Sequence, residues 1–245
     1  MKRSLVAVCS FVVLSSWALA FDHSHAAFTS LLQKHVAPAG VDYKDFKKDQ
    51  APLKAYLGDL AKVKESEFSS WSVGERLAFL INLYNATTIN VVLEHYPIRS
   101  FKSEVGGKDG PWKLKTVSVF GKTVSLDDLE HKMIRQKFNE PRIHFALNCA
   151  SDGCPALRAE AFKSANLSRQ LGEQTVGFLA DSSKNKVTPN KIQLSPIFDW
   201  FKEDFVKRSG SVKAFLNPYY KSFDVTKSKA NITYTNYGWS LNDAS

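Results

Sequence analysis

Cysteine and long apolar stretches are scarce in this chain. Three cysteines occur among 245 residues, too few for a disulfide framework to define the fold. After residue 20, no segment approaches eighteen uninterrupted apolar residues, about the length that a transmembrane helix requires. The chain also contains neither an internal repeat nor a low-complexity linker. These absences favour a folded protein without repeated units or membrane-spanning helices.

The first twenty residues have the pattern of a secretory signal peptide. Lys2 and Arg3 form a charged start, Leu5–Trp17 is mostly apolar, and Ala18–Ala20 matches the small-x-small pattern of a cleavage site. The apolar run is too short for a comfortable membrane span. Cys9 lies inside this run, whereas lipoprotein processing requires a cysteine at its end. We therefore predict cleavage near Ala20 and a soluble product that is periplasmic or secreted.

The remaining residues, 21–245, are numerous enough to form one large domain or two small ones. A chain of this length buries roughly 70% of its unfolded surface, so it does not depend on disulfides to fold. Cleavage lowers the formal net charge from +9 to +7, and the lysines are scattered rather than clustered in one stripe. This distribution argues against a nucleic-acid partner. We expect a monomer that binds an envelope peptide, protein or polymer and uses no cofactor.

The spacing of apolar residues predicts both helices and strands. Helices are expected at Ala26–Val36, Lys47–Val63, Val73–His95, Leu126–Gln136, Asn166–Ala180, Ile197–Val206 and Val212–Leu216. Strands are expected at Leu114–Phe120, Thr123–Val124, Ile143–Asn148 and Ile232–Thr235, with a further hairpin around residues 188–190. The predicted fold is therefore a single α+β domain, in which N-terminal helices pack with a small mixed or antiparallel sheet.

The segment Arg142–Pro155 carries most of the functional information. It begins as an apolar run typical of a buried strand, which contains His144, and ends in a short loop between Cys149 and Cys154. These are the only cysteines left after the signal is removed. In an oxidising compartment two such cysteines tend to form a disulfide. Closing this loop would stabilise the fold by roughly 2 kcal/mol on the loop-entropy model.

A free thiol is the alternative for Cys149, because a nearby imidazole or helix N-terminus stabilises a thiolate nucleophile. On an extended strand, His144 and Asn148 project to one face, opposite the apolar side chains that enter the core. The loop amides around Gly153 would then supply an oxyanion hole. Cys154 precedes a proline suited to open a helix, and it is the competing nucleophile.

Two further pairs of polar residues are candidates for the same site. Asn82 and Asn85 are three apart on the longest predicted helix and share a face. They either satisfy buried backbone or water, or orient a catalytic group, because a buried amide without partners is costly. Glu130 and His131 are neighbours on a shorter helix, where their side chains point about 100° apart.

These candidates combine into two kinds of site. In the first, Cys149 is the nucleophile, His144 or His131 is the base, and Glu130 or one of the asparagines orients it. In the second, Cys149, Cys154, His144 and His131 hold a tetrahedral zinc ion. The Cys-x4-Cys spacing is loose for zinc and differs from the Cys-x-x-Cys of thioredoxin-like exchange. No metal or other cofactor is therefore predicted.

Aromatic residues gather near the C-terminus, at Phe198–Phe201 and Tyr237–Trp239. Their helical or turn spacing is typical of core packing. The alternative is a platform that binds a sugar or a peptide. Both interpretations stay open at this point.

Several motifs of the chain resemble one family. They are residues 78–85, 124–131, 141–158, 195–201 and 237–242. Together they are similar to the "domain of unknown function 547" family of bacteria and plants, over about Val41–Asn242. The family has no established activity, so the resemblance implies membership but no reaction. Members usually carry tryptophan where Leu80 stands. The first cysteine of the loop recurs more widely than the second, which favours an individual role for Cys149.

Two functions follow from these features. The first is a thiol-dependent hydrolase or transferase that acts on an amide or related acyl bond, with Cys149 as nucleophile. The second is a non-enzymatic exported module, stapled by a Cys149–Cys154 disulfide, that binds a partner protein or an envelope polymer. Helix caps and turn signals do not separate the two.

Overall fold

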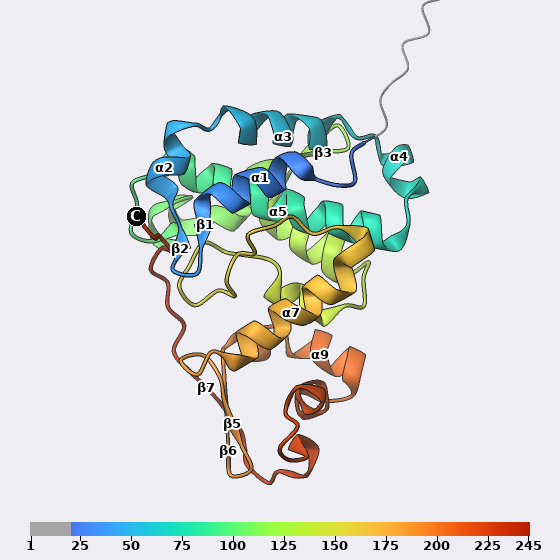
Figure 1. Ribbon diagram of the computed structural model, residues 1–245, viewed down its shortest axis with the longest axis vertical. Coiled ribbons are helices and arrows are strands. Elements are labelled where there is room, and N and C mark those ends of the chain that lie inside the picture. The colour runs from blue at the N-terminus through green and yellow to red at the C-terminus, as the bar shows by residue number, and fades with distance from the viewer. Residues whose placement is uncertain (1–20) are drawn as a thin grey trace, which may run out of the picture.

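The fold is α+β, as predicted. The computed structural model describes residues 21–245. The predicted signal peptide, residues 1–20, lies outside the described residues. Helices make up 54% of the structure and strands 12%, and the strands form three small sheets rather than one. Figure 1 shows α1, α2, α3 and α5 at one end of the molecule and β5–β7 at the other, with α7 between them.

Four short helices begin the described chain: α1 (Ala26–His35), α2 (Tyr43–Lys48), α3 (Ala51–Lys62) and α4 (Glu65–Ser70). The single helix predicted over Lys47–Val63 is wrong in its first part, because α2 ends at Lys48 and a new helix begins at Ala51. Pro52, in the first turn of α3, accounts for the restart, since proline fits the start of a helix but not its interior.

Helix α5 (Val73–His95) is the centre of the larger hydrophobic cluster. The predicted capping box is present: the Ser72 side chain accepts from the Glu75 N–H at 3.2 Å, and the Glu75 carboxylate accepts from the Ser72 N–H at 2.8 Å. Among the helices of residues 21–245, α5 alone is long and apolar enough to cross a membrane. However, 89% of its apolar 18-residue stretch is buried inside the protein. That burial is typical of a core helix.

A hairpin covers α5 and α3. Helix α6 (Phe101–Glu104) leads to β3 (Lys115–Val119) and β4 (Lys122–Ser125), which pair antiparallel as predicted. Phe120 and Gly121, between the strands, both have positive φ angles, 52° and 70°, and two such residues are typical of the tight turns that match strand twist. A second small hairpin joins β1 (Val36–Ala37) to β2 (Gly40–Val41).

Apart from Phe145, the smaller hydrophobic cluster is built from the C-terminal third of the chain. Its helices are α7 (Leu167–Ala180), α8 (Ile197–Trp200), α9 (Lys202–Ser209) and α10 (Val212–Leu216), and its strands are β5 (Lys186–Thr188), β6 (Lys191–Leu194) and β7 (Ile232–Tyr234). β5 pairs antiparallel with β6, and β7 pairs parallel with it. The helix predicted over Ile197–Val206 is interrupted at Phe201, so it is two helices.

The strand predicted over Ile143–Asn148 is wrong. Pro141–Phe145 forms a turn of 3₁₀-helix, and the chain is irregular after it. Ile143 belongs to the larger hydrophobic cluster and Phe145 to the smaller one. The apolar run therefore reflects burial between two cores, and a pattern of that kind does not distinguish a strand from other buried backbone.

Side chains replace the neighbouring strand that this segment lacks. The Asn85 amide donates to the Ala146 carbonyl and accepts from the Asn148 N–H, both at 2.9 Å. Gln174 on α7 donates to the Phe145 carbonyl at 3.0 Å. Because these side chains satisfy the buried backbone, no strand pairing is needed.

Candidate functional site

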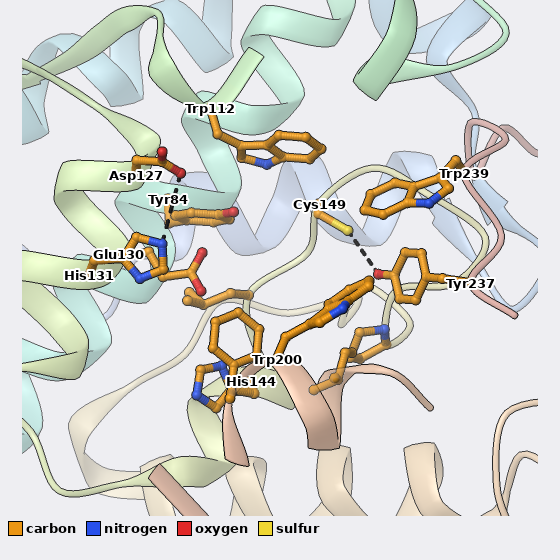
Figure 2. A pocket seen from close by; sticks show the side chains of 14 residues that line it. Tyr84, Trp112, Asp127, Glu130, His131, His144, Cys149, Trp200, Tyr237 and Trp239 are labelled. Carbon is orange, nitrogen blue, oxygen red and sulfur yellow. Dashed lines mark hydrogen bonds and ion pairs between the residues drawn. The ribbon is translucent and has the colours of Figure 1, made fainter. Parts of the chain in front are cut away.

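A pocket of about 180 Å³ lies where the two clusters meet. Six aromatic side chains line it: Tyr84, Trp112, Trp200, Phe201, Tyr237 and Trp239. It brings together four of the predicted site residues, namely Glu130, His131, His144 and Cys149. Figure 2 shows Trp112, Trp239, Tyr237 and Trp200 around Cys149, with Asp127, Glu130 and His131 across the pocket from them.

A π-helix over Asp128–Arg135 positions the acidic side of the pocket. Ser125 caps it, since its hydroxyl accepts from the Asp128 N–H at 3.0 Å. The hydrogen bond from the Gln136 N–H to the His131 carbonyl spans five residues, which widens the turn relative to an α-helix. The adjacent residues Glu130 and His131 both line the same pocket.

Glu130 is surrounded by protein and reaches the pocket with only part of its side chain. Burial raises the pKa of this carboxyl to about 7, while the positive charge of Arg135 and a hydrogen bond with Tyr84 oppose the shift. Burial also raises the pKa of Tyr84 well above its usual value, so the Tyr84 hydroxyl stays protonated and available as a donor. Near neutral pH, Glu130 is therefore able both to donate and to accept a proton.

His144 is held in a network behind the pocket wall. Its side chain is 1% exposed and stacks on Phe201, with 3.9 Å between ring centres. Its Nε2 lies 2.7 Å from Asp204 Oδ2, and Arg135 donates to both oxygens of Asp204, at 2.7 and 3.2 Å. Burial lowers the pKa of His144 to about 4 despite the attraction of Asp204. A neutral His144 must then donate from Nε2 to Asp204, and among residues 21–245 no hydrogen bond joins its ring to Cys149.

His131 is also tied to Arg135. A guanidinium only donates, so the contact of 2.8 Å from Arg135 Nη1 makes His131 Nδ1 an acceptor. Burial, together with the charge of Arg135, lowers the pKa of His131. Its Nε2 lies 3.9 Å from Asp127 Oδ1, so the imidazole faces a carboxylate rather than a sulfur.

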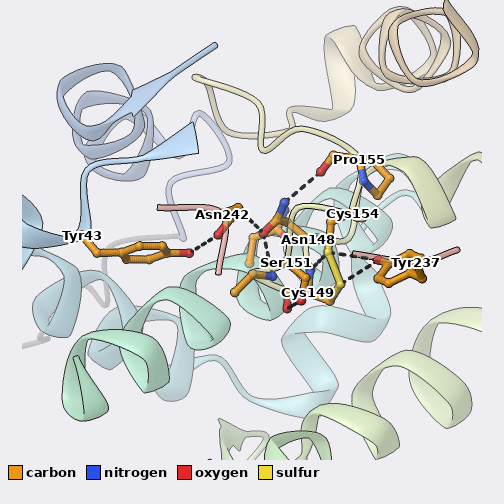
Figure 3. Close-up of a disulfide and its surroundings, with 10 residues drawn as sticks. Tyr43, Asn148, Cys149, Ser151, Cys154, Pro155, Tyr237 and Asn242 are labelled. Carbon is orange, nitrogen blue, oxygen red and sulfur yellow. Dashed lines mark hydrogen bonds between the residues drawn. A yellow bond between two sulfur atoms is a disulfide. The ribbon is translucent and has the colours of Figure 1, made fainter. Parts of the chain in front are cut away.

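The two cysteines form a disulfide, with Sγ atoms 2.00 Å apart (Figure 3). Cys149 lines the aromatic pocket, whereas Cys154 is 2% exposed. A disulfide sulfur has no proton, so the contact of 3.1 Å to Cys149 Sγ is a donation from the Tyr237 hydroxyl. Among residues 21–245, no hydrogen bond joins Cys149 to an imidazole. The structure therefore shows the disulfide interpretation and not the Cys–His pair.

The expectation of an oxyanion hole in the disulfide loop is wrong. The Asp152 N–H donates to the Ser240 carbonyl and the Gly153 N–H to the Gly238 carbonyl, both at 2.9 Å. The C-terminal segment therefore occupies donors that a substrate would need. Cys154 also opens no helix, because the chain after Pro155 is irregular up to the turn before α7. The loop pattern alone could not predict the first outcome, because the carbonyls that occupy these donors belong to Gly238 and Ser240, far along the chain.

Asn82 and Asn85 do not line the pocket. Asn82 donates to the Phe162 carbonyl at 2.8 Å and accepts from the Phe162 N–H at 2.9 Å. Asn85 likewise donates to the Ala146 carbonyl and accepts from the Asn148 N–H. Of the two roles considered for these amides, the structure shows the binding of buried backbone.

The zinc arrangement is not formed either. Two of its four ligands are joined as a disulfide. In the part of the chain that the structure describes, no three histidine, cysteine, aspartate or glutamate side chains are placed to hold a metal ion.

Several pocket residues were missed in the sequence. Tyr84, Asp127 and Trp112 lie within or near motifs that were recognised, but no spacing rule indicated that they face one pocket. Asp204 is 60 residues from its partner His144, and no local signal links them. For the aromatic residues near the C-terminus, the alternative of a binding platform had been recognised, and Trp200 and Tyr237 do line the pocket.

The aromatic pocket with its acidic wall is the candidate site of this α+β fold. Residues 68–179 match the model of the family described as "Protein of unknown function, DUF547". Over this region the chain is a member of that family, as its motifs predicted. The match includes Glu130, His131 and both cysteines but ends before Trp200 and Tyr237. No curated protein and no solved structure matches the chain significantly.

Proposed function

We propose that the protein is an exported hydrolase or transferase that acts on a glycosidic bond, with Glu130 as its general acid–base group. The observation that carries this proposal is the placement of Glu130. It shares one aromatic-lined pocket with a second carboxylate, Asp127. Most enzymes that cleave glycosidic bonds use a pair of carboxyl groups at one site as their catalytic groups.

The aromatic lining supports a sugar as the bound group. The C–H face of a sugar ring packs on aromatic side chains, while its hydroxyls donate to carboxylates. Trp200 and Trp239 are nearly parallel, at 22° and 5.8 Å between centres, and Tyr237 lies 4.9 Å from Trp200. Trp200 is 49% exposed, so it offers a face at the pocket mouth.

The two carboxylates have different surroundings. The Asp127 side chain is 40% exposed, whereas Glu130 is enclosed, and its pKa of about 7 leaves it protonated in roughly half of the molecules at neutral pH. Glu130 would donate its proton to the leaving oxygen as the glycosidic bond breaks. Water, or an acceptor hydroxyl in a transfer, would then bond to the anomeric carbon and return a proton to the Glu130 carboxylate. Asp127 would supply the second carboxylate, which stabilises the positive charge that develops on the sugar.

This proposal keeps the predicted class, hydrolysis or transfer, but moves the catalytic group from Cys149 to Glu130. A thiol mechanism needs a free thiolate, and the bonded sulfurs do not provide one. The bonded sulfurs favour the second candidate, a binding module stapled by Cys149–Cys154 that holds an envelope polymer without cleaving it.

Export is part of the proposal. It is supported by the signal-like pattern of residues 1–20 and by the disulfide, because such bonds persist in oxidising compartments. N-terminal sequencing of the protein from its native host should find a new terminus near Phe21. An intact Met1 would contradict export by cleavage.

The reaction is tested with N-acetylglucosamine oligomers and with peptidoglycan sacculi, with products identified by mass spectrometry. We expect new reducing ends from at least one of them. Glu130→Gln should lower the rate by a factor of about 10²–10⁴ with binding retained. Glu67→Gln, at a partly exposed position on α4 outside the pocket, is the matched control and should react as wild type.

Three other outcomes are informative. Binding without cleavage by the wild type would support the binding module. Cleavage of amide bonds that appears only after reduction, and is lost in Cys149→Ala, would restore the thiol mechanism. Absence of both binding and cleavage would contradict the choice of a sugar ligand.

A further inference from the structure

A second cavity, of about 550 Å³, lies away from the aromatic pocket. Its walls come from α4, from the first turns of α5, from the β3–β4 hairpin and from the π-helix. Its floor is apolar and is formed by Phe68, Leu80, Val119, Val124, Met133 and Phe138. None of these residues lines the aromatic pocket, so the two sites are separate. Its volume lies within the range typical of small-molecule sites, about 300–1,000 Å³.

The rim of this groove is cationic. The groove is lined by four basic side chains, namely Arg76, Lys122, Lys132 and Lys137. Glu65 is the one acidic side chain in the lining. Lys132 is already paired with Asp128 at 2.6 Å. Arg76 differs, because its Nε is buried and has no hydrogen-bond partner among residues 21–245. A buried guanidinium N–H without an acceptor is costly, and an anion would satisfy it with a charge-assisted hydrogen bond.

The apolar surface extends beyond this cavity. A neighbouring cavity of about 440 Å³ shares Val73, Lys137 and Phe138 with it, and continues along Leu167 and Leu171. Val73 lies at this junction and is 61% exposed, the largest exposure of the large apolar side chains in the described chain. An extended apolar surface of this kind fits a straight chain better than a compact ring.

We propose that this groove binds a long-chain fatty acid, with the acyl chain on the apolar floor and the carboxylate at Arg76. The excess of positive charge on the rim selects an anion, and the apolar length selects an alkyl chain. Met133 suits such a ligand, because a flexible thioether adapts to chains of different shape. This inference is independent of the glycosidic reaction and concerns different residues.

The test is a fluorescence titration of the purified protein with cis-parinaric acid, followed by displacement with oleate or with oleyl alcohol. We expect saturable binding with one site, and oleate should displace the probe at a concentration at least about tenfold lower than oleyl alcohol. Arg76→Gln should weaken probe binding about tenfold, because one charge-assisted hydrogen bond is lost. Arg99→Gln, an exposed arginine outside the groove, is the matched control.

A second variant guards against misfolding of Arg76→Gln. Val73 is exposed and is the first residue of α5, where an acidic side chain complements the helix dipole. Val73→Glu should therefore stay folded, as circular dichroism would show, and should weaken probe binding by repulsion. The proposal is overturned if the wild type shows no saturable binding, if oleate and oleyl alcohol displace equally, or if Val73→Glu binds as wild type. Equal weakening by Arg76→Gln and Arg99→Gln would also overturn it.

Discussion

Two carboxyl groups near the aromatic pocket have pKa values shifted in opposite directions. For Glu130, burial is the largest influence and raises the pKa to about 7. For Asp204, burial acts in the same direction, but hydrogen bonds from His144 and Arg135 outweigh it and hold the pKa well below its usual range. The difference lies in the donors: two cationic or N–H partners aim at Asp204, whereas Glu130 faces a neutral phenol. One acid is therefore a fixed charge and the other a proton carrier.

The raised pKa of Glu130 has a consequence for stability. Between the unfolded value of 4.5 and the folded value of about 7, the folded state binds more protons than the unfolded state. The free energy of unfolding therefore falls as pH rises through this window. Glu130→Gln removes this penalty and should gain stability relative to wild type by about 3 kcal/mol between pH 4.5 and pH 8. Urea unfolding of both proteins across this range measures it, and a difference independent of pH would contradict it.

At the scale of elements, side chains of α5 make the backbone hydrogen bonds that a neighbouring strand would otherwise make. Asn82 and Asn85 bind the backbone of the irregular segments around Ala146 and Phe162. These segments carry the disulfide loop and lead to α7, so the amides link the central helix to the pocket wall. Removing one leaves both a buried N–H and a buried carbonyl without a partner, which is more costly than losing a surface hydrogen bond.

Asn85→Ala should therefore lower the free energy of unfolding by about 3 kcal/mol. Chemical denaturation measures the change, with Asn90→Ala as control. Asn90 lies on the same helix, but its amide bonds only the exposed Glu94, so its loss should cost less than about 1 kcal/mol. Equal losses in the two variants would contradict the assigned role of Asn85.

Elements set by local signals were predictable, and those set by distant partners were not. The capping box at Ser72 and the apolar pattern after it define α5 within the sequence that forms it. The strand expected at Ile143–Asn148 failed because Asn85 and Gln174 satisfy that backbone from far away in the chain. Four predicted site residues do share the pocket. Their hydrogen-bond partners were missed because they lie far along the chain: Asp204 bonds His144, and Tyr237 bonds Cys149.

At the scale of the whole molecule, the C-terminal segment joins parts that are far apart. After β7 it runs toward β2, as Figure 1 shows, and on the way its carbonyls accept hydrogen bonds from the disulfide loop. Asn242 accepts from the Val41 N–H at 2.9 Å, and the Tyr43 hydroxyl donates to its side chain at 2.9 Å (Figure 3). The same segment supplies Tyr237 and Trp239 to the pocket. The same segment therefore both closes the fold and completes the pocket.

Gly153 tests this coupling. A Cβ at this position would lie 2.7 Å from the Tyr237 ring and 2.9 Å from the Gly238 carbonyl, so the C-terminal segment would have to shift. Gly153→Ala should lower stability by about 1–3 kcal/mol and weaken ligand binding in the pocket. Gly177→Ala, in α7 with open space around its Cβ, should instead raise stability by about 0.5–1 kcal/mol. Thermal unfolding of both variants measures the contrast, and a shift of the same sign would contradict it.

The central claim is that Glu130 carries an exchangeable proton near neutral pH. Carbon-13 NMR of protein labelled at the glutamate side-chain carboxyls, with Glu130→Gln to assign the signal, measures its titration directly. We expect a midpoint near pH 7. A midpoint near the ordinary value of 4.5 would contradict it, because Glu130 would then have no proton to donate at neutral pH.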